Sequence, residues 1–237
     1  MNENIDEDIN IASRTIKSIL YARKHNGLYS SIVTGQRGIG KSSYCIQILY
    51  NVFRTLGYEV DESWQMALDR TLYTIPEIIK FLDESTDKPD KDLFIWDDAG
   101  VFAGGVRWLT NQQEMVYIES ICDTLRDSVY GIFLNVPDIR TLSRRLRTYD
   151  DFLVKIYRLN DEKIKLLYED PTTIREARLY KKMITPASQV RVYRQYKDNF
   201  DVMLPSWVYE EYKEKRHKYT KNNIAHLKKH LSEQNIE

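Results

Sequence analysis

The sequence has little of several features that would mark a special class of protein. It contains 2 cysteines, 9 glycines and 6 prolines among 237 residues, too few for a disulfide-stapled scaffold or a low-complexity chain. No apolar run approaches the roughly 20 residues that a membrane helix needs, so no membrane partner is expected. The first eight residues are acidic, unlike a secretory signal or a transit peptide, and we expect a cytoplasmic protein whose Cys45 and Cys122 are buried free thiols.

The net charge of zero hides an uneven distribution along the chain. Residues 1–137 carry 13 basic and 20 acidic side chains, whereas residues 138–237 carry 22 and 15, which gives net charges of −7 and +7. A basic segment is the electrostatic signature of contact with nucleic acid. Two halves that complement each other across a subunit interface, or solvated helices, are the alternatives. The charge pattern therefore predicts a DNA partner.

Hydrophobic periodicity and turn residues predict alternating strands and helices. Strands are expected at 29–34, 70–73, 93–96, 130–136 and 152–158, and helices at 11–24, 41–56, 74–82, 111–127 and 140–147. The third of these helices starts at a Thr-x-x-Glu capping box, Thr74 to Glu77. This alternation predicts an α/β fold, a doubly wound, three-layer αβα core with a mostly parallel sheet, whose ligand lies at the carboxyl ends of the strands.

Beyond this core the pattern changes. We expect an antiparallel hairpin that uses residues 164–168, a further alternating segment at 177–183, and a helix from 205 to 231 with a break near 222. The predicted organisation is an N-terminal helical segment (1–26), an α/β core (27–160) and a small, basic β-hairpin and helical extension (161–237). Lysines of the extension, interleaved with Tyr212 and Tyr219, are candidates for DNA contact or, alternatively, a solvated helix face.

One motif carries the predicted chemistry. Residues 35–42, Gly-Gln-Arg-Gly-Ile-Gly-Lys-Ser, match G-x-x-x-x-G-K-[ST] between a predicted strand and a predicted helix. Glycines let successive backbone N–H groups turn toward a phosphate, and the helix N-terminus adds a partial positive charge. Lys41 is then placed for the β- and γ-phosphates and Ser42 for Mg²⁺. A plain strand-to-helix turn is the alternative. The predicted nucleotide contacts are Gly35, Gln36, Arg37, Gly38, Ile39, Gly40, Lys41, Ser42 and Ser43.

Two acids complete the predicted site. Asp97 and Asp98 end the apolar strand at 93–96. Asp97 is the candidate to hold Mg²⁺ through water, together with Ser42, and Asp98 is the candidate to orient or deprotonate the attacking water. Alternatively, adjacent acids at a strand end cap the loop that follows.

Together with Asn135 at the tip of the next strand, these motifs resemble the P-loop ATPases of the additional-strand class, which includes AAA+, RecA-like and HerA/FtsK-like motors. The segments 96–100, 144–147 and 204–209 are similar to small ATPases of archaeal viruses and plasmids. The resemblance implies that Asn135 is a sensor near the γ-phosphate and that Arg144, Arg145 or Arg147 is an arginine finger. Most of the class has Glu where this chain has Asp98, so the catalytic role could instead fall on Glu114.

The sequence thus predicts a Mg²⁺-dependent enzyme that binds and hydrolyses ATP and acts on DNA as a homo-oligomer, in replication, loading, packaging or partition, with a replication or packaging partner. The predicted catalytic residues are Lys41, Asp98, Asn135, Arg144 and Arg147. Three alternatives stay open: an ATP-gated, non-hydrolysing DNA-binding switch; a small-molecule or nucleotide kinase with the arginines as a lid; and a GTPase. The GTPase is disfavoured because Val136 stands where the guanine-specifying motif has Lys.

Overall fold

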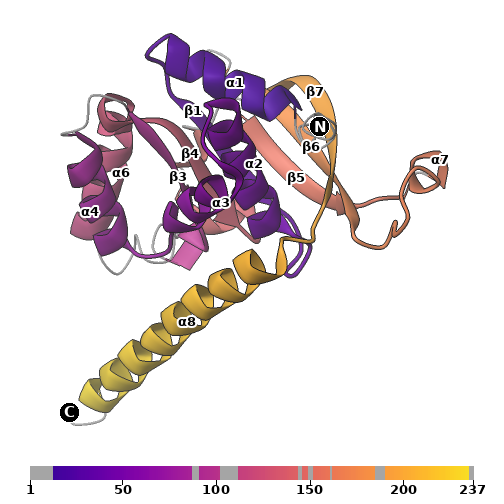
Figure 1. The fold of residues 1–237 in the computed structure, drawn as a ribbon. Helices are drawn as coiled ribbons and strands as arrows, with labels where there is room; N and C mark the ends of the chain where they lie inside the picture. Colours follow the sequence, from indigo (N-terminus) through magenta and orange to yellow (C-terminus); the bar gives the residue numbers. More distant parts are fainter. Residues whose placement is uncertain are drawn as a thin grey trace. The chain divides into compact units, whose positions relative to one another are not determined.

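The computed structural model describes residues 13–86, 91–101, 112–143, 146–148, 152–160, 162–184 and 190–234. Its fold is α/β, with a seven-stranded, mostly parallel sheet flanked by helices (Figure 1). The chain forms two compact units, Met1–Met203 and Leu204–Glu237. All seven strands lie in the first unit, so this unit contains the complete sheet.

The order of the strands brings distant parts of the chain together. The strands are β1 (Tyr29–Thr34), β2 (Thr71–Leu72), β3 (Asp92–Trp96), β4 (Val129–Val136), β5 (Phe152–Arg158), β6 (Ile174–Ile184) and β7 (Val190–Asp201). They are arranged β2-β3-β4-β1-β5-β6-β7. Strands β1 to β5 are parallel to one another, β6 is antiparallel to β5, and β7 is antiparallel to β6. As a result β4 separates β1 from β3, and the β6–β7 hairpin extends the sheet beyond β5.

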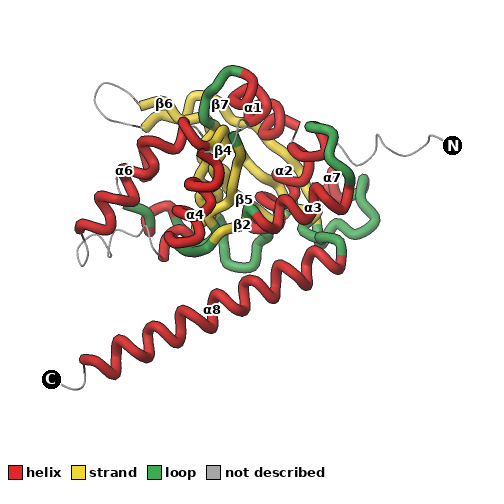
Figure 2. Tube along the Cα trace, turned by 60° about the vertical axis from the view of Figure 1, so that its left-hand side comes forward, coloured by secondary structure: helices red, strands yellow, loops and turns green. Residues whose placement is uncertain are grey.

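Helices cover both faces of the sheet (Figure 2). The helices are α1 (Ser13–Lys24), α2 (Lys41–Thr55), α3 (Val60–Asp69), α4 (Ile75–Thr86), α6 (Gln112–Ser128), α7 (Glu162–Lys165) and α8 (Ser206–Gln234). Three single 3₁₀ turns, η2 (Ala99–Val101), η3 (Ile139–Thr141) and η4 (Leu146–Thr148), follow β3 and β4. In the first unit, α1, α2 and α3 lie on one face of the sheet, and α4 and α6 lie on the other. This produces the expected three layers.

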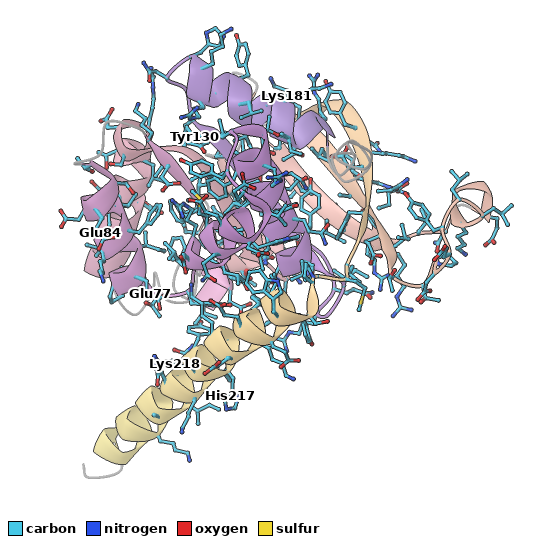
Figure 3. The ribbon with its side chains drawn as sticks, viewed as in Figure 1. Glu77, Glu84, Tyr130, Lys181, His217 and Lys218 are labelled. Atoms are coloured by element: carbon cyan, nitrogen blue, oxygen red, sulfur yellow. The ribbon has the colours of Figure 1, made fainter. Side chains whose placement is uncertain are left out.

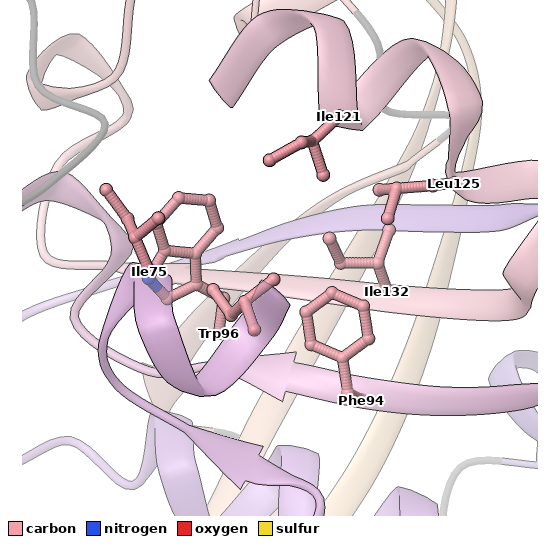
Figure 4. Close-up of a pocket in the computed structure, with 7 residues that line it drawn as sticks. Ile75, Phe94, Trp96, Ile121, Leu125 and Ile132 are labelled. Atoms are coloured by element: carbon pink, nitrogen blue, oxygen red, sulfur yellow. The ribbon is translucent and has the colours of Figure 1, made fainter. Parts of the chain in front are cut away.

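The face under α4 and α6 is a closed apolar core. Phe94, Ile132 and Leu125 are almost fully buried there, and the ring centroids of Phe81 and Phe94 lie 5.3 Å apart. A cavity of about 10 Å³ lies between these helices and the sheet. Figure 4 shows the apolar side chains and the Trp96 ring that line it. A space of that size is at the lower limit for one water molecule and offers it almost no polar partner, so this face is packing rather than a ligand site.

Most of the predicted core elements are confirmed. The strand expected at 29–34 is β1, and the capping box forms, because Glu77 accepts hydrogen bonds from the backbone N–H groups of Tyr73 and Thr74 at 2.8 and 3.0 Å. The helix α3 was not predicted, although Asp61 and Glu62 in its first turn suit a helix N-terminus. Its Trp64 stacks on Tyr50 of α2 with ring centroids 3.8 Å apart.

Several predictions beyond β4 were wrong. Residues 164–168 form no strand, because the chain first makes the short helix α7 (Glu162–Lys165), whose turn continues with hydrogen bonds from Leu166 N–H to Glu162 O and from Tyr168 N–H to Lys165 O. A second turn, in which Asp170 accepts hydrogen bonds from Thr172, precedes β6. The hairpin is instead formed by β6 and β7, which lie within the segment expected to be an extension. The helix expected at 140–147 is replaced by η3 and η4, separated by an extended Leu142.

The helix α8 runs without the predicted break near Asn222, since two asparagines cost a helix only a few tenths of a kcal/mol each. Cys45 is a buried free thiol, as predicted, and burial raises its pKa well above the usual value. The side chain of Cys122 lies outside the described residues. No helix within the described ranges is long and apolar enough to cross a membrane.

Candidate functional site

The glycine loop predicted to bind phosphate connects β1 to α2. Its three glycines all have positive φ angles, 154° for Gly35, 73° for Gly38 and 105° for Gly40, a region that other residues rarely adopt. A Cβ added to Gly38 would meet nothing within 4 Å, so the loop is open there. Ile39 is buried and anchors the loop. The glycines therefore shape an exposed turn of backbone, on which Gln36 and Arg37 are exposed.

Lys41 is the first residue of α2 and folds back over this loop. Its ammonium group donates hydrogen bonds to the backbone carbonyls of Gly35 and Gln36 at 3.0 and 3.1 Å. Both acceptors are neutral and one of these bonds is exposed. A positive charge is thus held at the mouth of the loop, beside the N-terminus of α2, whose first turn also contains Ser42 and Ser43.

Three polar side chains from three elements meet beside the loop. The hydroxyl of Ser42 donates to the carboxylate of Asp97 at 3.0 Å, and the Asn135 amide donates to the same carboxylate at 2.6 Å and to the Ser42 hydroxyl at 3.1 Å. Asp97 and Asn135 are 1% and 2% exposed. Asp97 directly follows β3, and Asn135 is the second-last residue of β4. Because β4 pairs with both β3 and β1, the topology brings the carboxyl ends of these strands together.

The oxygen atoms of this cluster fit a divalent cation. The Oδ1 atom of Asn135 is buried and has no hydrogen-bond partner among the described residues. Mg²⁺ prefers hard oxygen ligands, keeps several waters and commonly binds through one or two protein groups plus substrate phosphates. The described residues contain no group of three or more His, Cys, Asp and Glu that could hold a metal alone. Ser42 and Asp97 are therefore suited to a metal that arrives with its own phosphate and water ligands.

The turn after Asp97 places the second acid at the rim of the cluster. Asp98 has a φ of 55°, in the left-handed region, and its backbone N–H donates to Asp97 Oδ1 at 3.2 Å. Gly100, in the same turn, approaches the Thr141 side chain of η3 so closely that a Cβ at this position would collide with it. Asp98 is partly exposed, so its carboxylate is accessible to water.

The structure describes only one of the arginines predicted to act as a finger. Arg147 lies in η4 and is partly buried; its backbone N–H donates to Ser143 O at 3.2 Å. Ser143 is itself held by Glu119, whose carboxylate accepts its hydroxyl at 2.9 Å. Arg144, Arg145 and the side chain of Glu114 lie outside the described residues.

The β6–β7 hairpin contributes contacts to the loop that the sequence did not predict. Arg175 of β6 donates from Nε to the Ile39 carbonyl at 3.2 Å, and desolvation together with the nearby Arg158 lowers its pKa. Val202, just after β7, packs directly against Gly40. These residues lie more than 130 positions from the loop, and no local sequence signal reports such a pairing.

On α2, the amide of Gln47 donates to Asp201 O at 2.6 Å. Gln47 is 3% exposed, and this bond fastens the end of β7 to the helix that follows the loop. The glycine loop is therefore supported on one side by β1 and α2, and on the other by the hairpin.

Comparison with known proteins identifies a viral relative. No family model matches the chain. The chain is 27% identical over 222 residues to the uncharacterized protein B-251 of Sulfolobus spindle-shape virus 1, covering 92% of this chain and 85% of that protein. Among solved structures, B204, the DNA-packaging ATPase from Sulfolobus Turreted Icosahedral Virus, matches with a TM-score of 0.43 and 11% identity over 70% of this chain and 97% of that one. Over most of its length, the chain is therefore similar to a viral protein.

Proposed function

We propose that this protein is a Mg²⁺-dependent ATPase that acts on DNA as an oligomer. The observation that carries the proposal is the meeting of Ser42, Asp97 and Asn135 beside the Lys41 ammonium, at the carboxyl ends of neighbouring parallel strands. A strand-to-helix turn with only a structural role needs neither the lysine nor the buried carboxylate.

The contacts around the loop suggest how a nucleotide is held. The open turn at Gly38 leaves room for phosphate oxygens next to backbone N–H groups. On binding, Lys41 exchanges the neutral carbonyls of Gly35 and Gln36 for phosphate oxygens, because an anionic acceptor adds the Coulomb attraction between opposite charges. Ser42 and Asp97 then face the metal, which would neutralise developing charge on the phosphates.

The same arrangement assigns roles in hydrolysis. Asp98 is in reach of solvent and is proposed to orient the attacking water, while Asn135 senses the γ-phosphate. An arginine from 144–147 is proposed to reach the site of a neighbouring subunit and stabilise the charge of the transition state. Hydrolysis then depends on assembly, because that charge comes from another copy of the chain.

The order of the strands supports this class over the GTPase alternative. The strand that contains Asn135, β4, lies between β1 and β3, which is the order expected for the additional-strand class. The net charge of +7 on residues 138–237 supports the proposed DNA partner.

Nucleotide binding and turnover test the proposal together. Calorimetric titration with ATP and Mg²⁺ is expected to detect binding to the wild-type protein and none to Lys41→Ala. Lys80→Ala is the matched control, because Lys80 is 78% exposed on α4 and is paired only with Glu84 of its own helix among the described residues. Equal ATP affinity of Lys41→Ala and wild type would contradict the proposed site.

Phosphate release, measured with and without DNA, tests the catalytic roles. Asp98→Asn is expected to keep ATP binding and lose hydrolysis, and Arg147→Ala is expected to keep binding and lower turnover about 100- to 1000-fold, as when one stabilising group is removed from a transition state. Full activity of either variant would reject its assigned role. The mass of the assembly with ATP bound reports whether subunits associate.

An ATP-gated switch is the second candidate, because the chain has Asp98 where most of the class has Glu. The shorter side chain leaves more distance to an attacking water. Tight ATP binding without steady phosphate release, with or without DNA, would favour this switch over the ATPase.

A further inference from the structure

A second concave surface lies at the other end of β1 from the glycine loop. A groove of about 680 Å³ runs between α1 and the first residues of β1 and β5. It borders Tyr29, the first residue of β1, whereas the glycine loop follows Thr34, the last. Six residues of extended strand span roughly 17 Å, so the groove is separate from the proposed nucleotide site.

The lining of the groove carries one sign of charge. Arg14, Lys17 and Lys181 line it together with a histidine and four aromatic residues, and none of the described residues that line it is acidic. Surface grooves lined by one sign of charge concentrate ligands of the opposite sign. The groove is therefore built for an anion.

One face of α1 forms the outer wall. Arg14, Lys17, Tyr21 and His25 are three or four residues apart, so they lie in a row along one side of the helix. The opposite side is buried, with Ile19 fully enclosed in the core. Tyr21 is 67% exposed, and its ring centroid lies 4.2 Å from that of His25. The row thus combines cations with an accessible aromatic surface.

The sheet forms the inner wall with the same combination. Phe152 at the start of β5 pairs in register with Lys181 of β6, and the Lys181 ammonium lies 5.8 Å from the centre of the Phe152 ring. Across from it, the Arg14 guanidinium lies 4.6 Å from the centre of the Tyr196 ring and donates to the Tyr196 hydroxyl at 3.2 Å. In Figure 3, Lys181 is labelled beside α1, at the end of the sheet that the groove borders.

We propose that this groove binds single-stranded nucleic acid. Proteins that hold single strands combine a positively charged groove, which follows the backbone, with aromatic rings on which bases stack. The cations of α1 and β6 provide the first feature, and Tyr21 provides the second. An acidic peptide would use the cations but not the rings, and the bases of a duplex are already stacked on one another. The volume is that of a ligand pocket, between 300 and 1,000 Å³, which suits a short stretch of one strand.

The inference rests on the proposed function in one respect, since a DNA partner is proposed there. It goes further by assigning the contact to α1 and the start of the sheet rather than to the lysines of α8. It does not depend on ATP, because the groove and the glycine loop share no residue.

Fluorescence anisotropy with a labelled twelve-residue oligothymidine, in the absence of ATP and Mg²⁺, tests the groove in the full-length protein. Tyr21→Ala is expected to weaken binding by about 5- to 100-fold, the effect of losing one stacked base. Lys17→Ala is expected to lower affinity and to reduce the slope of log affinity against log salt by about 0.7, the contribution of one phosphate contact on a single strand. Both side chains are exposed, so neither variant removes core packing.

Tyr168→Ala and Lys80→Ala are the matched controls, at exposed positions outside the groove, and are expected to bind like wild type. The proposal is overturned if the wild-type protein does not bind the oligonucleotide at about 50 mM salt, the low end at which such contacts are measured. It is also overturned if the two groove variants bind like wild type. A duplex or an oligoglutamate that competes as well as the unlabelled single strand would overturn it too. Oligonucleotide binding without ATP binding would contradict the proposed ATPase alone, and ATP binding without oligonucleotide binding would contradict the groove alone.

Discussion

The substitution Gly40→Ala tests whether the β6–β7 hairpin clamps the glycine loop. Gly40 has a φ of 105°, and a Cβ at this position would lie well inside 3.0 Å of Val202 Cγ1. Val202 is held in place, because its backbone N–H donates to Thr173 O at 3.1 Å. The alanine therefore meets both an unfavourable backbone conformation and a fixed neighbour.

Two costs add up in this variant. A positive φ costs a residue with a Cβ roughly 1–2 kcal/mol, and an overpacked contact costs typically 1–3 kcal/mol. We expect Gly40→Ala to lower the free energy of unfolding by about 2–5 kcal/mol. Gly38→Ala is the control, since Gly38 also has a positive φ but an added Cβ meets nothing within 4 Å; its loss should be about 1–2 kcal/mol.

Urea denaturation of the two variants measures this difference. The double variant Gly40→Ala/Val202→Ala should recover part of the loss, because truncation removes Cγ1 and leaves the Val202 Cβ at 3.3 Å. The reasoning is refuted if Gly40→Ala is no less stable than Gly38→Ala, or if the second substitution adds to the damage by the full cost of a separate site.

Three further predictions concern buried or partly buried charges of the first unit. Burial raises the pKa of Asp198 from 3.8 to about 6, so the neutral carboxyl contributes its full stability below pH 3.8, and this stability is lost as the pH rises through about 6. In urea denaturation, Asp198→Asn should therefore raise the free energy of unfolding by about 2–3 kcal/mol over wild type at pH 7.5 and by nothing near pH 3.5. An equal gain at both pH values would contradict the raised pKa. Arg70 and Asp92 form a two-point ion pair at 2.7 Å, with side chains only 17% and 9% exposed. Arg70→Ala should lower the free energy of unfolding in urea by about 3 kcal/mol, because it leaves the Asp92 carboxylate without its cation. A loss below about 1 kcal/mol, that of a surface ion pair, would contradict this prediction. Arg175→Ala removes the hydrogen bond to the Ile39 carbonyl of the glycine loop. It should weaken ATP binding about tenfold, roughly the contribution of one hydrogen bond from a charged donor. An unchanged ATP affinity would mean that the hairpin does not position the loop.

The elements predicted well are those specified by local pattern. The apolar run at β3 and the small and β-branched residues of β1 predicted these two strands correctly, since burial on both faces of a parallel sheet leaves a mark in the sequence itself. The hairpin was placed wrongly because residues 164–168 look like a strand in isolation, whereas Glu162–Lys165 form the short helix α7 and β5 pairs instead with β6.

The candidate site divides in the same way. Asp97 and Ser42 were identified from motifs, but their direct hydrogen bond, and the bonds that Asn135 donates to both of them, depend on β4 lying between β1 and β3. Neither Arg175 nor Val202 was predicted to contact the loop. Both belong to the β6–β7 hairpin and its end, and the sequence alone does not show that this hairpin lies beside the glycine loop.

By itself the sequence determined the glycine loop, the lysine and serine that follow it and the acids after the apolar strand, because glycine conformations and short spacings act over a few residues. Tertiary structure alone decided which side chains meet at the loop and that α1 and the hairpin enclose a basic, aromatic groove. Those contacts join residues from 38 to 182 positions apart, and only the pairing of strands brings them together.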